Sequence, residues 1–580
     1  MRQAQTDFPD KCKEHFRFIY GEEALEECLN RLNQLLEKYN LLPAGPTSAE
    51  ENWTHRDHIL ITYADMVTAS VMDEHSHLAK QHKFVNEMLS TEISTLHLLP
   101  FFPSSSDDGF SVVDYRRVDE QCGAWDDIET MVRDYRIMAD LVINHVSRHS
   151  SWFRKYIDGD ERYRDFFIEV EEDVDLSDVT RPRSNPLLTP VETAHGHKRV
   201  WSTFSEDQID LNFRNPDVLF EILDIFFFYL SKGIRVIRLD AVAFIWKEVG
   251  TPCIHLPQTH EIVRLFRTLV DHLAPDVTLI TETNVPHKEN ISYFGEGDEA
   301  HMVYQFSLPP LLLHALMTEN GEYLTRWAAS LEELPEGCTY FNFTSSHDGI
   351  GVRPLEGLVP DQELEQLVQW IKDRGGFVSY KSNGDKSQSP YELNITYFDA
   401  FASNNGFSGI QEKRFLCSQI IKMSLLGVPG IYFHNLTGTR NFQEGVRMTG
   451  RLRSINRKKW GYDELMDELQ DSHTRTHKIF YSYRELIRKR NQVRAFDPFG
   501  KQKVYDVGKD YFVIERSDSD QSQRILIVCN LTLTRKKMDL VKLGLPVKRD
   551  HDYTNLLTDK TGVSNGETLL DPYDVLWIEI

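Results

Sequence analysis

The sequence has few cysteines, and they are not arranged in pairs. Seven cysteines are spread over 580 residues, and the sequence contains no Cys-x-x-Cys motif. A scattered, odd-numbered set is typical of reduced thiols and argues against a disulfide framework or a zinc site built from paired cysteines. The positions are Cys12, Cys28, Cys122, Cys253, Cys338, Cys417 and Cys529. We therefore expect a cytoplasmic protein with free thiols.

Long apolar runs and an excess of basic residues are also missing. Residues 1–7 lack the apolar stretch of a signal peptide, and apolar runs such as residues 225–230 are far too short to span a bilayer. The formal net charge is -24, whereas nucleic-acid binding depends on clustered Lys and Arg. We expect neither a membrane span nor a nucleic-acid partner. Small anionic substrates are not excluded, because a basic pocket can lie inside an acidic surface.

Eight short runs of apolar and β-branched residues alternate with helical patterns in the middle of the chain. This alternation predicts an α/β fold in which eight parallel strands close into a (β/α)8 TIM barrel. A doubly wound open sheet is the alternative that the pattern leaves open. The predicted strands are residues 59–65, 95–100, 137–143, 235–240, 277–282, 301–306, 338–343 and 430–433.

The length of the chain predicts more than one domain, because single cores usually stop growing before 580 residues. Residues 11 to about 40 have helical periodicity and precede a linker rich in Pro and Gly, and short alternating strands after about residue 492 predict a small β-sandwich. Two segments are too long to be simple loops and are expected to be inserted subdomains. The predicted parts are an N-terminal helical extension (1–54), a barrel in three pieces (55–145, 215–348 and 403–491), insertions at 146–214 and 349–402, and a C-terminal β domain (492–580).

Acidic side chains stand at the ends of three predicted strands: Asp240, Glu282 and Asp348. Side chains at the C-terminal ends of barrel strands project into the active site. Glycosyl transfer with retention needs a nucleophile and an acid/base whose carboxyl groups lie roughly 5–5.5 Å apart, which adjacent strands provide. We expect Asp240 to be the nucleophile, Glu282 the acid/base with a raised pKa, and Asp348 the group that stabilises positive charge on the sugar. The acids are not clustered as in a calcium cage, so no metal and no cofactor are predicted.

Neighbouring residues support these roles. Arg238 lies two positions before Asp240, so both point to the same side of the strand, and its guanidinium is expected to keep Asp240 ionised and oriented. His347 is a hydrogen-bond donor beside the third acid. In the motif Asp-x-x-x-Asn-His, Asp140 is expected to be structural and His145 to reach the sugar. A buried structural Arg-Asp pair and a surface or capping Glu are the alternative interpretations.

Taken in order, the motifs Asp-x-x-x-Asn-His, Arg-x-Asp, a strand-end Glu and His-Asp resemble the α-amylase clan of glycoside hydrolases from about residue 55 to the end. Residues 237–242, 247–253, 308–315 and 347–351 resemble the sucrose phosphorylase branch of that clan. Enzymes of that branch move glucose from a glucoside onto inorganic phosphate with retention and give α-glucose 1-phosphate. The resemblance implies this activity, whereas the carboxylate pattern alone equally allows hydrolysis.

The resemblance also implies further site residues. Asp107 and Arg453 match the pair that holds the far hydroxyls of glucose, and Phe110 matches an aromatic platform under the sugar. Arg183, in Thr-Arg-Pro-Arg, matches the arginine that binds phosphate, and Tyr391 matches a loop tyrosine that alternates between acceptor contacts. Roles in a turn, in the core or on the surface are the alternatives for these residues.

The acceptor side departs from the sucrose phosphorylase pattern. Asn284 lies where that branch has a Val-x-His-like sequence, and Glu392 replaces the usual Gln after Tyr391. Residues 281–291, 179–183 and 186–190 resemble glucosylglycerate phosphorylases more closely. Arg181 and Arg183 are expected to bind the carboxylate of glycerate and phosphate in turn. An ionised Glu392 near an anion is unfavourable, so we expect it to be paired with a lysine or turned away.

The expected partners are therefore a small-molecule glucoside and inorganic phosphate. The hypothesis is a retaining glucosylglycerate phosphorylase, with glucosylglycerol, sucrose or sucrose 6′-phosphate as alternative substrates. A hydrolase or transglucosidase is a second class, and a non-catalytic relative is a third. The oligomeric state does not follow from the sequence.

Overall fold

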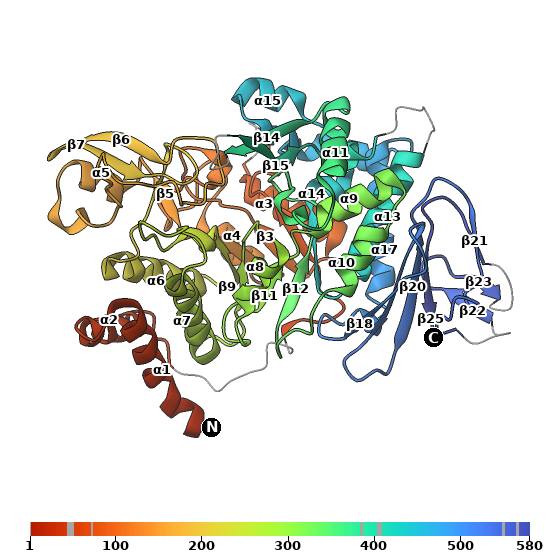
Figure 1. Ribbon diagram of the computed structural model, residues 1–580, viewed down its shortest axis with the longest axis horizontal. Helices are drawn as coiled ribbons and strands as arrows, with labels where there is room; N and C mark the ends of the chain where they lie inside the picture. The colour runs from red at the N-terminus through yellow and green to blue at the C-terminus, as the bar shows by residue number, and fades with distance from the viewer. Residues whose placement is uncertain are drawn as a thin grey trace.

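The computed structural model describes residues 2–42, 52–70, 74–382, 387–402, 409–547, 552–563 and 568–580. A strand barrel occupies the centre, and the N-terminal helices and C-terminal strands lie at opposite ends of the long axis (Figure 1). Over the described ranges, no helix combines the length and the apolar character needed to cross a bilayer.

The barrel is closed and consists of eight strands in the order β1-β16-β12-β11-β10-β9-β4-β3, all paired in parallel. This confirms the predicted barrel and excludes the open sheet. Each strand overlaps one of the eight predicted runs. The strands are β1 (Ile59–Thr62), β3 (Thr95–Leu98), β4 (Arg136–Val142), β9 (Ile234–Asp240), β10 (Thr278–Thr281), β11 (Met302–Tyr304), β12 (Thr339–Asn342) and β16 (Val428–Tyr432).

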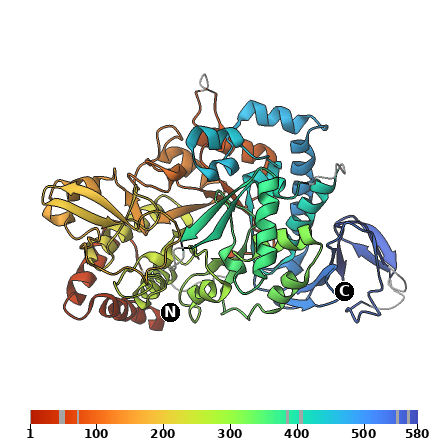
Figure 2. The same cartoon turned by 45° about the horizontal axis from the view of Figure 1, so that its top comes forward.

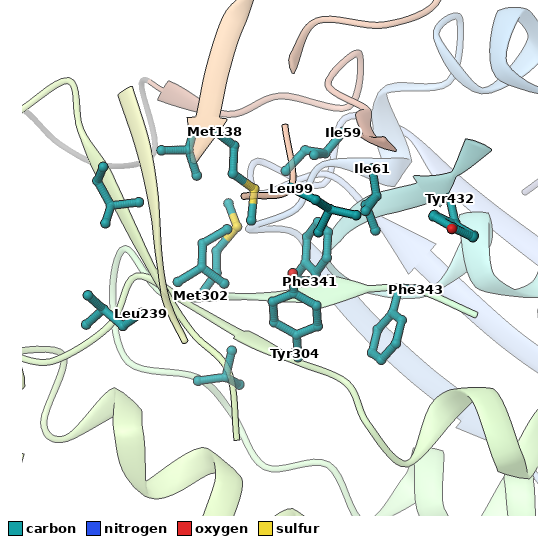
Figure 3. Close-up of a cluster of buried hydrophobic side chains, with 14 of the residues drawn as sticks. Ile59, Ile61, Leu99, Met138, Leu239, Met302, Tyr304, Phe341, Phe343 and Tyr432 are labelled. Atoms are coloured by element: carbon teal, nitrogen blue, oxygen red, sulfur yellow. The ribbon is translucent and has the colours of Figure 1, made fainter. Parts of the chain in front are cut away.

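Large apolar side chains fill the space between the strands. Figure 3 shows Ile59, Met138, Met302 and Phe341, from four different strands, pointing toward one another. Gly430 on β16 makes room for this packing, because an ideal Cβ there lies 2.4 Å from Phe341 Cζ. The interior is therefore packed rather than open, and substrates meet the barrel only at the ends of its strands.

Helices cover the outside of the barrel. At the start of α6, the Asn215 side chain accepts a hydrogen bond from the Asp217 N–H, and Pro216 occupies the first position. The helical patterns in the sequence at residues 259–273 and 363–374 lie within or overlap α7 and α11. The principal outer helices are α3 (His77–Leu89), α4 (Trp125–Met131), α6 (Pro216–Ser231), α7 (Pro257–Leu273), α9 (Leu308–Thr318), α10 (Glu322–Ala329), α13 (Ile410–Ser424) and α17 (Arg475–Arg490).

Two insertions leave the C-terminal ends of barrel strands. The first follows β4, and its hairpin β6–β7 extends at one end of the molecule (Figure 2). The second follows β12. The limits predicted for these parts stay predictions, and residues 383–386 of the second lie outside the described residues. The first contains β5 (His145–Ser147), α5 (Ser151–Ile157), β6 (Leu188–Thr193), β7 (Gly196–Trp201) and β8 (Gln208–Asp210), and the second β13 (Ile350–Gly351), α11 (Asp361–Asp373), β14 (Phe377–Ser382) and β15 (Gln388–Asn394).

The N-terminal helical pattern belongs to two helices, α1 (Arg2–Tyr20) and α2 (Leu25–Lys38). The chain leaves α1 at Gly21, whose φ of +81° suits glycine. Helix α1 lies against α7, where His15 Nδ1 is 2.7 Å from Glu261 Oε1. Most of the linker predicted after this pattern lies outside the described residues.

The C-terminal strands form two antiparallel sheets, in agreement with the predicted β-sandwich. A six-stranded sheet has the order β18-β19-β20-β25-β22-β23, and β21 pairs with β24. Val513 and Leu526 of the larger sheet and Met538 and Leu570 of the smaller belong to one separate apolar cluster. The strands are β18 (Lys501–Tyr505), β19 (Tyr511–Ser517), β20 (Arg524–Asn530), β21 (Lys536–Met538), β22 (Asp552–Asn555), β23 (Lys560–Val563), β24 (Thr568–Leu570) and β25 (Val575–Glu579).

Candidate active site

A layer of buried polar side chains connects β3, β4 and β9. His97 Nε2 lies 2.8 Å from Asp140 Oδ2, and Arg238 pairs with the other oxygen of Asp140. Arg238 Nη1 also lies 2.8 Å from Asp240 Oδ1, as their spacing on one strand predicts. Arg238 is therefore fixed by two carboxylates and orients Asp240.

Glu282 follows β10 and lies beside the same arginine. Its Oε2 is 3.9 Å from Arg238 Nη2 and accepts a 3.1 Å hydrogen bond from the backbone N–H of Ala241. Ala241 has a φ of +50°, which is unfavourable for a residue other than glycine. This strained residue, next to Asp240, thus supplies the N–H that holds Glu282.

Asp240 and Glu282 share a buried environment that disfavours two negative charges. Burial raises the pKa of Asp240 well above its ordinary value, against the effect of Arg238 and together with that of Glu282. Burial also raises the pKa of Glu282, again against Arg238. Arg238 lowers the pKa of Asp240, but the effect of burial is larger. Its direct bond to Asp240 nevertheless favours the charge there, and the expected assignment of the proton to Glu282 stays a prediction.

Asp348, in the loop after β12, lies between two arginines. Its Oδ1 is 2.5 Å from Arg453 Nη1 and 3.8 Å from Arg457 Nη2. Burial alone would raise the pKa of Asp348, but Arg453 and Arg457 hold this pKa below its ordinary range. His347 Nε2 lies 3.4 Å from the same oxygen, and burial keeps the pKa of His347 well below its ordinary value. Asp348 is therefore an ionised carboxylate beside a neutral imidazole.

Asp107 pairs with Arg457 and lies farther from Arg453, the arginine that was expected to hold glucose with it. Arg457 Nη1 lies 3.3 Å from Asp107 Oδ1 and also contacts Asp108, whereas Arg453 Nη1 is 4.0 Å from Asp107 Oδ2. Both arginines belong to the run Leu-Arg-Ser-Ile-Asn-Arg around η7 (Leu452–Asn456). They are four positions apart, so spacing does not distinguish them, and the expected glucose contact of Arg453 stays a prediction.

The loop that carries Asp107 has an unusual backbone. Asp107, Asp108 and Gly109 have φ values of +55°, +49° and +110°. Aspartate tolerates this region better than most residues. Gly109 is required, because an ideal Cβ there lies 2.4 Å from the carbonyl oxygen of Pro100. The conformation presents both carboxylates to Arg457.

Phe110 stacks on His347, with ring centroids 4.5 Å apart and an interplanar angle of 7°. The Arg238 guanidinium carbon lies 5.7 Å from the centre of the Phe110 ring. His145 Nε2 is 3.0 Å from the carbonyl oxygen of Phe110 and 3.1 Å from Gln208 Nε2. His145 therefore positions Phe110 through protein contacts, and its expected contact with a sugar stays a prediction.

The two insertions meet at Arg183 and Tyr391. The guanidinium carbon of Arg183 lies 5.2 Å from the centre of the Tyr391 ring. Arg183 also lines a cavity of about 560 Å³ with Asp107 and Arg453. Arg181, which was expected to act with Arg183, donates to the backbone of Asn185 instead and does not line this cavity.

Glu392 is paired with an arginine and not, as expected, with a lysine. Arg453 Nε and Nη2 donate to its two oxygens at 3.0 and 2.7 Å. The predicted acceptor residue Asn284 packs against Gly351, where an ideal Cβ lies 2.6 Å from each polar atom of the Asn284 amide. The second insertion thus lies directly on the loop that follows Glu282.

Sequence reasoning missed several residues of this region. Arg457 and Asp108 adjoin predicted residues and follow from no spacing rule. Lys247 Nζ lies 2.8 Å from Asp210 Oδ2 and 2.7 Å from Asn144 Oδ1. Asn144 belongs to the Asp-x-x-x-Asn-His motif, but Asp210 had no signal in the sequence. Among the described residues, no group of three or more His, Cys, Asp or Glu side chains is arranged to hold a metal ion.

Comparisons with known proteins agree with this architecture. The alpha amylase catalytic domain family matches residues 83–349. The crystal structure of sucrose 6F-phosphate phosphorylase from Thermoanaerobacter thermosaccharolyticum superposes with a TM-score of 0.71 at 25% identity, over 82% of this chain and 94% of that one. The fold and the strand-end carboxylates define an α-amylase-type barrel enzyme.

Several relatives match over nearly the whole chain. Glucosylglycerate phosphorylase of Spirochaeta thermophila is 43% identical over 98% of both chains. Glucosylglycerate phosphorylase of Escherichia coli is 40% identical over 100% of both. The chain therefore belongs to the glucosylglycerate phosphorylase family within the sucrose phosphorylase branch.

Proposed function

We propose that the protein transfers glucose from 2-O-(α-D-glucopyranosyl)-D-glycerate to inorganic phosphate, which gives α-D-glucose 1-phosphate and D-glycerate. One observation carries the proposal: the carboxylates Asp240, Glu282 and Asp348 gather around arginines, beside a cavity that Arg183 and Arg453 line. The near-full-length identity to glucosylglycerate phosphorylases supports the choice of substrate.

The geometry supports a double displacement. Asp240 attacks the anomeric carbon, Glu282 gives its proton to the glycosidic oxygen, and D-glycerate leaves. A phosphate oxygen then attacks the same carbon, the Asp240 carboxylate leaves, and Glu282 accepts the phosphate proton. Two inversions retain the α configuration. Asp348 stays ionised and stabilises the positive charge on the ring.

The glucose itself is held by a different set of side chains. Asp107 and Arg457 bind the hydroxyls far from the reacting carbon, and Phe110 forms a platform under the ring. Phe110 is suited to this role because His145 and His347 fix its position. These assignments take Arg457 in place of Arg453 for the glucose contacts.

Phosphate must reach the glucosyl ester before water does. The guanidinium of Arg183 suits phosphate, because its planar fork matches the oxygens and its charge offsets their repulsion from the carboxylates. Tyr391 lies against Arg183, and we expect its ring to help exclude water. We place this reaction in the cytoplasm, which is supported by seven free cysteines, six of them buried.

The test is a panel of glucosides with release of glucose 1-phosphate as the readout. Glucosylglycerate should be the preferred donor over glucosylglycerol, sucrose and sucrose 6′-phosphate, and turnover should require phosphate. Strong turnover of another donor with little activity on glucosylglycerate would contradict the choice of substrate. Phosphate-independent release of glucose at the same rate would indicate a hydrolase.

The Arg183→Ala variant separates phosphorolysis from hydrolysis. Its phosphate-dependent rate should fall by about 10- to 100-fold, the loss expected for one charge-assisted hydrogen bond, while slow hydrolysis persists. Arg181→Ala is the matched control, because Arg181 comes from the same loop but does not line the cavity. Equal losses in both variants would contradict the role of Arg183.

A further inference from the structure

We propose that Arg453 selects an anionic acceptor and that Glu392 is the positioning residue that holds its guanidinium in place. The inference rests on the proposed phosphorylase function and specifies how its acceptor is recognised. In this assignment, Arg453 and Arg183 bind the carboxylate of glycerate in one half-reaction and phosphate in the other. Arg181 has no part in the site.

Arg453 is more exposed than Arg457 and faces the cavity. Side-chain exposure is 18% for Arg453 and 3% for Arg457. Arg453 lines the cavity together with Arg183, whereas Arg457 does not line it and contacts Asp107 and Asp108. Arg453 therefore presents its guanidinium to the cavity, next to the Asp107–Arg457 pair that we propose to hold glucose.

Glu392 is held in place by burial, by its backbone and by its side chain. This residue is 1% exposed, and its backbone is paired on both sides, with Gly351 of β13 and Ser379 of β14. Two parallel hydrogen bonds, at 3.0 and 2.7 Å, join it to Nε and Nη2 of Arg453. Because the guanidinium is planar, this pairing also fixes the direction of Nη1.

The pairing with Glu392 uses Nε and Nη2 of Arg453 and leaves its Nη1 atom for other partners. It lies 2.5 Å from Asp348 Oδ1 and 4.0 Å from Asp107 Oδ2. Nη1 carries two N–H groups, and one close carboxylate takes only one of them. Arg453 therefore has a remaining donor at the junction between the glucose contacts and the cavity.

The charged side chains around the cavity favour the binding of a small anion. Pairing with Arg453 neutralises Glu392, which removes the repulsion that an isolated carboxylate would exert on glycerate or phosphate. Within the described part of the chain, Arg183 has no carboxylate within 4.0 Å, and it also faces the cavity. Arg183 therefore keeps its positive charge for a small anion, and Arg453 adds a hydrogen-bond donor beside it.

The decisive experiment compares two acceptors that differ only at the recognised group. With α-D-glucose 1-phosphate as the donor, kcat/KM is measured for D-glycerate and for glycerol, which has a hydroxymethyl group in place of the carboxylate. The ratio of the two values isolates recognition of the anion, because any effect on the glucosyl donor, on Asp348 or on folding is common to both. A wild-type enzyme that does not use glycerate would overturn the proposed function itself.

Arg453→Gln should lower kcat/KM for glycerate about 10- to 100-fold more than that for glycerol. Arg451→Gln is the matched control: it removes a positive charge from an exposed side chain that lines the same cavity, and it should leave the ratio nearly unchanged. Equal losses with both acceptors in Arg453→Gln would overturn the inference and leave the proposed function standing. If that variant does not fold, Arg453→Lys is measured on the same ratio, and an unchanged ratio has the same meaning.

Glu392→Gln tests the positioning role. It keeps the shape of the side chain but loses the charge that binds Arg453 at two points, so the KM for glycerate should rise with little change in kcat. In the Glu392→Gln/Arg453→Gln double variant, the change in the glycerate-to-glycerol ratio should be no larger than in Arg453→Gln alone. Additive losses would show that Glu392 acts independently of Arg453 and would overturn its role.

Discussion

At the scale of single residues, environment assigns different roles to chemically similar carboxylates. Asp240 accepts a direct hydrogen bond from Arg238, whereas Glu282 lies farther from it and is held by a backbone N–H. Asp348, between two arginines, has a lowered pKa. With Glu282 protonated and Asp240 and Asp348 ionised, as we propose, the site has the division of labour that double displacement needs.

Glu282→Gln should remove the alkaline limb of the pH profile. The reactive form has Glu282 protonated, so kcat/KM falls as pH rises through its raised pKa, and a glutamine does not titrate. The loss of rate should be about 10²- to 10⁴-fold on glucosylglycerate. It should be much smaller on α-D-glucosyl fluoride, whose leaving group needs no proton. Persistence of the alkaline limb in the variant would show that another group titrates.

At the scale of secondary-structure elements, the sequence predicted the barrel strands but only some of the loop contacts. All eight barrel strands were predicted, because a buried parallel strand needs a short continuous run of apolar residues. The acids at their ends followed from the same runs. The partner of Asp107 did not follow, because it depends on a loop with three successive positive φ values and on a contact some 350 residues away in the chain.

Gly109→Ala tests that loop. Its φ of +110° and the closeness of Pro100 predict a destabilisation of about 1–3 kcal/mol and a weaker affinity for the glucosyl donor. Thermal unfolding and KM for glucose 1-phosphate measure the two effects. Gly508→Ala is the control, since Gly508 has a similar φ of +102° but no atom within 4 Å of the added Cβ. A variant that behaves like Gly508→Ala would show that the close approach has no role.

At the scale of the whole molecule, the parts added to the barrel are attached by polar contacts as well as apolar packing. Asp224 on α6 accepts hydrogen bonds from Lys38 Nζ at 2.6 Å and from the Tyr39 hydroxyl at 2.9 Å, and it pairs with Arg116 at 2.5 Å. Its carboxylate joins the N-terminal helices to the barrel. Although burial opposes them, these three partners hold the pKa of Asp224 below 3.8.

Asp224→Asn should therefore lower stability without changing kcat. A carboxyl group with a depressed pKa in the folded state stabilises it above the unfolded-state pKa and loses this effect as pH falls through the folded-state value. We expect a deficit of about 1–3 kcal/mol at neutral pH, which shrinks as pH falls below about 3.8. Thermal unfolding of both proteins at several pH values measures it. A deficit that does not depend on pH would indicate that packing, and not the charge, is responsible.

The sequence by itself determined the barrel, the three acids at its strand ends and the strand-rich C-terminal region, because each depends on local periodicity or on the order of motifs. It also predicted site roles for Arg453, Tyr391 and Glu392. Only the tertiary structure decided that Arg457 holds Asp107, that Arg453 holds Glu392, and that Arg181 lies outside the cavity. The sequence pattern around Arg453 and Arg457 does not show which of the two binds which carboxylate. Their partners lie on distant loops, and only the closing of the barrel brings those loops together.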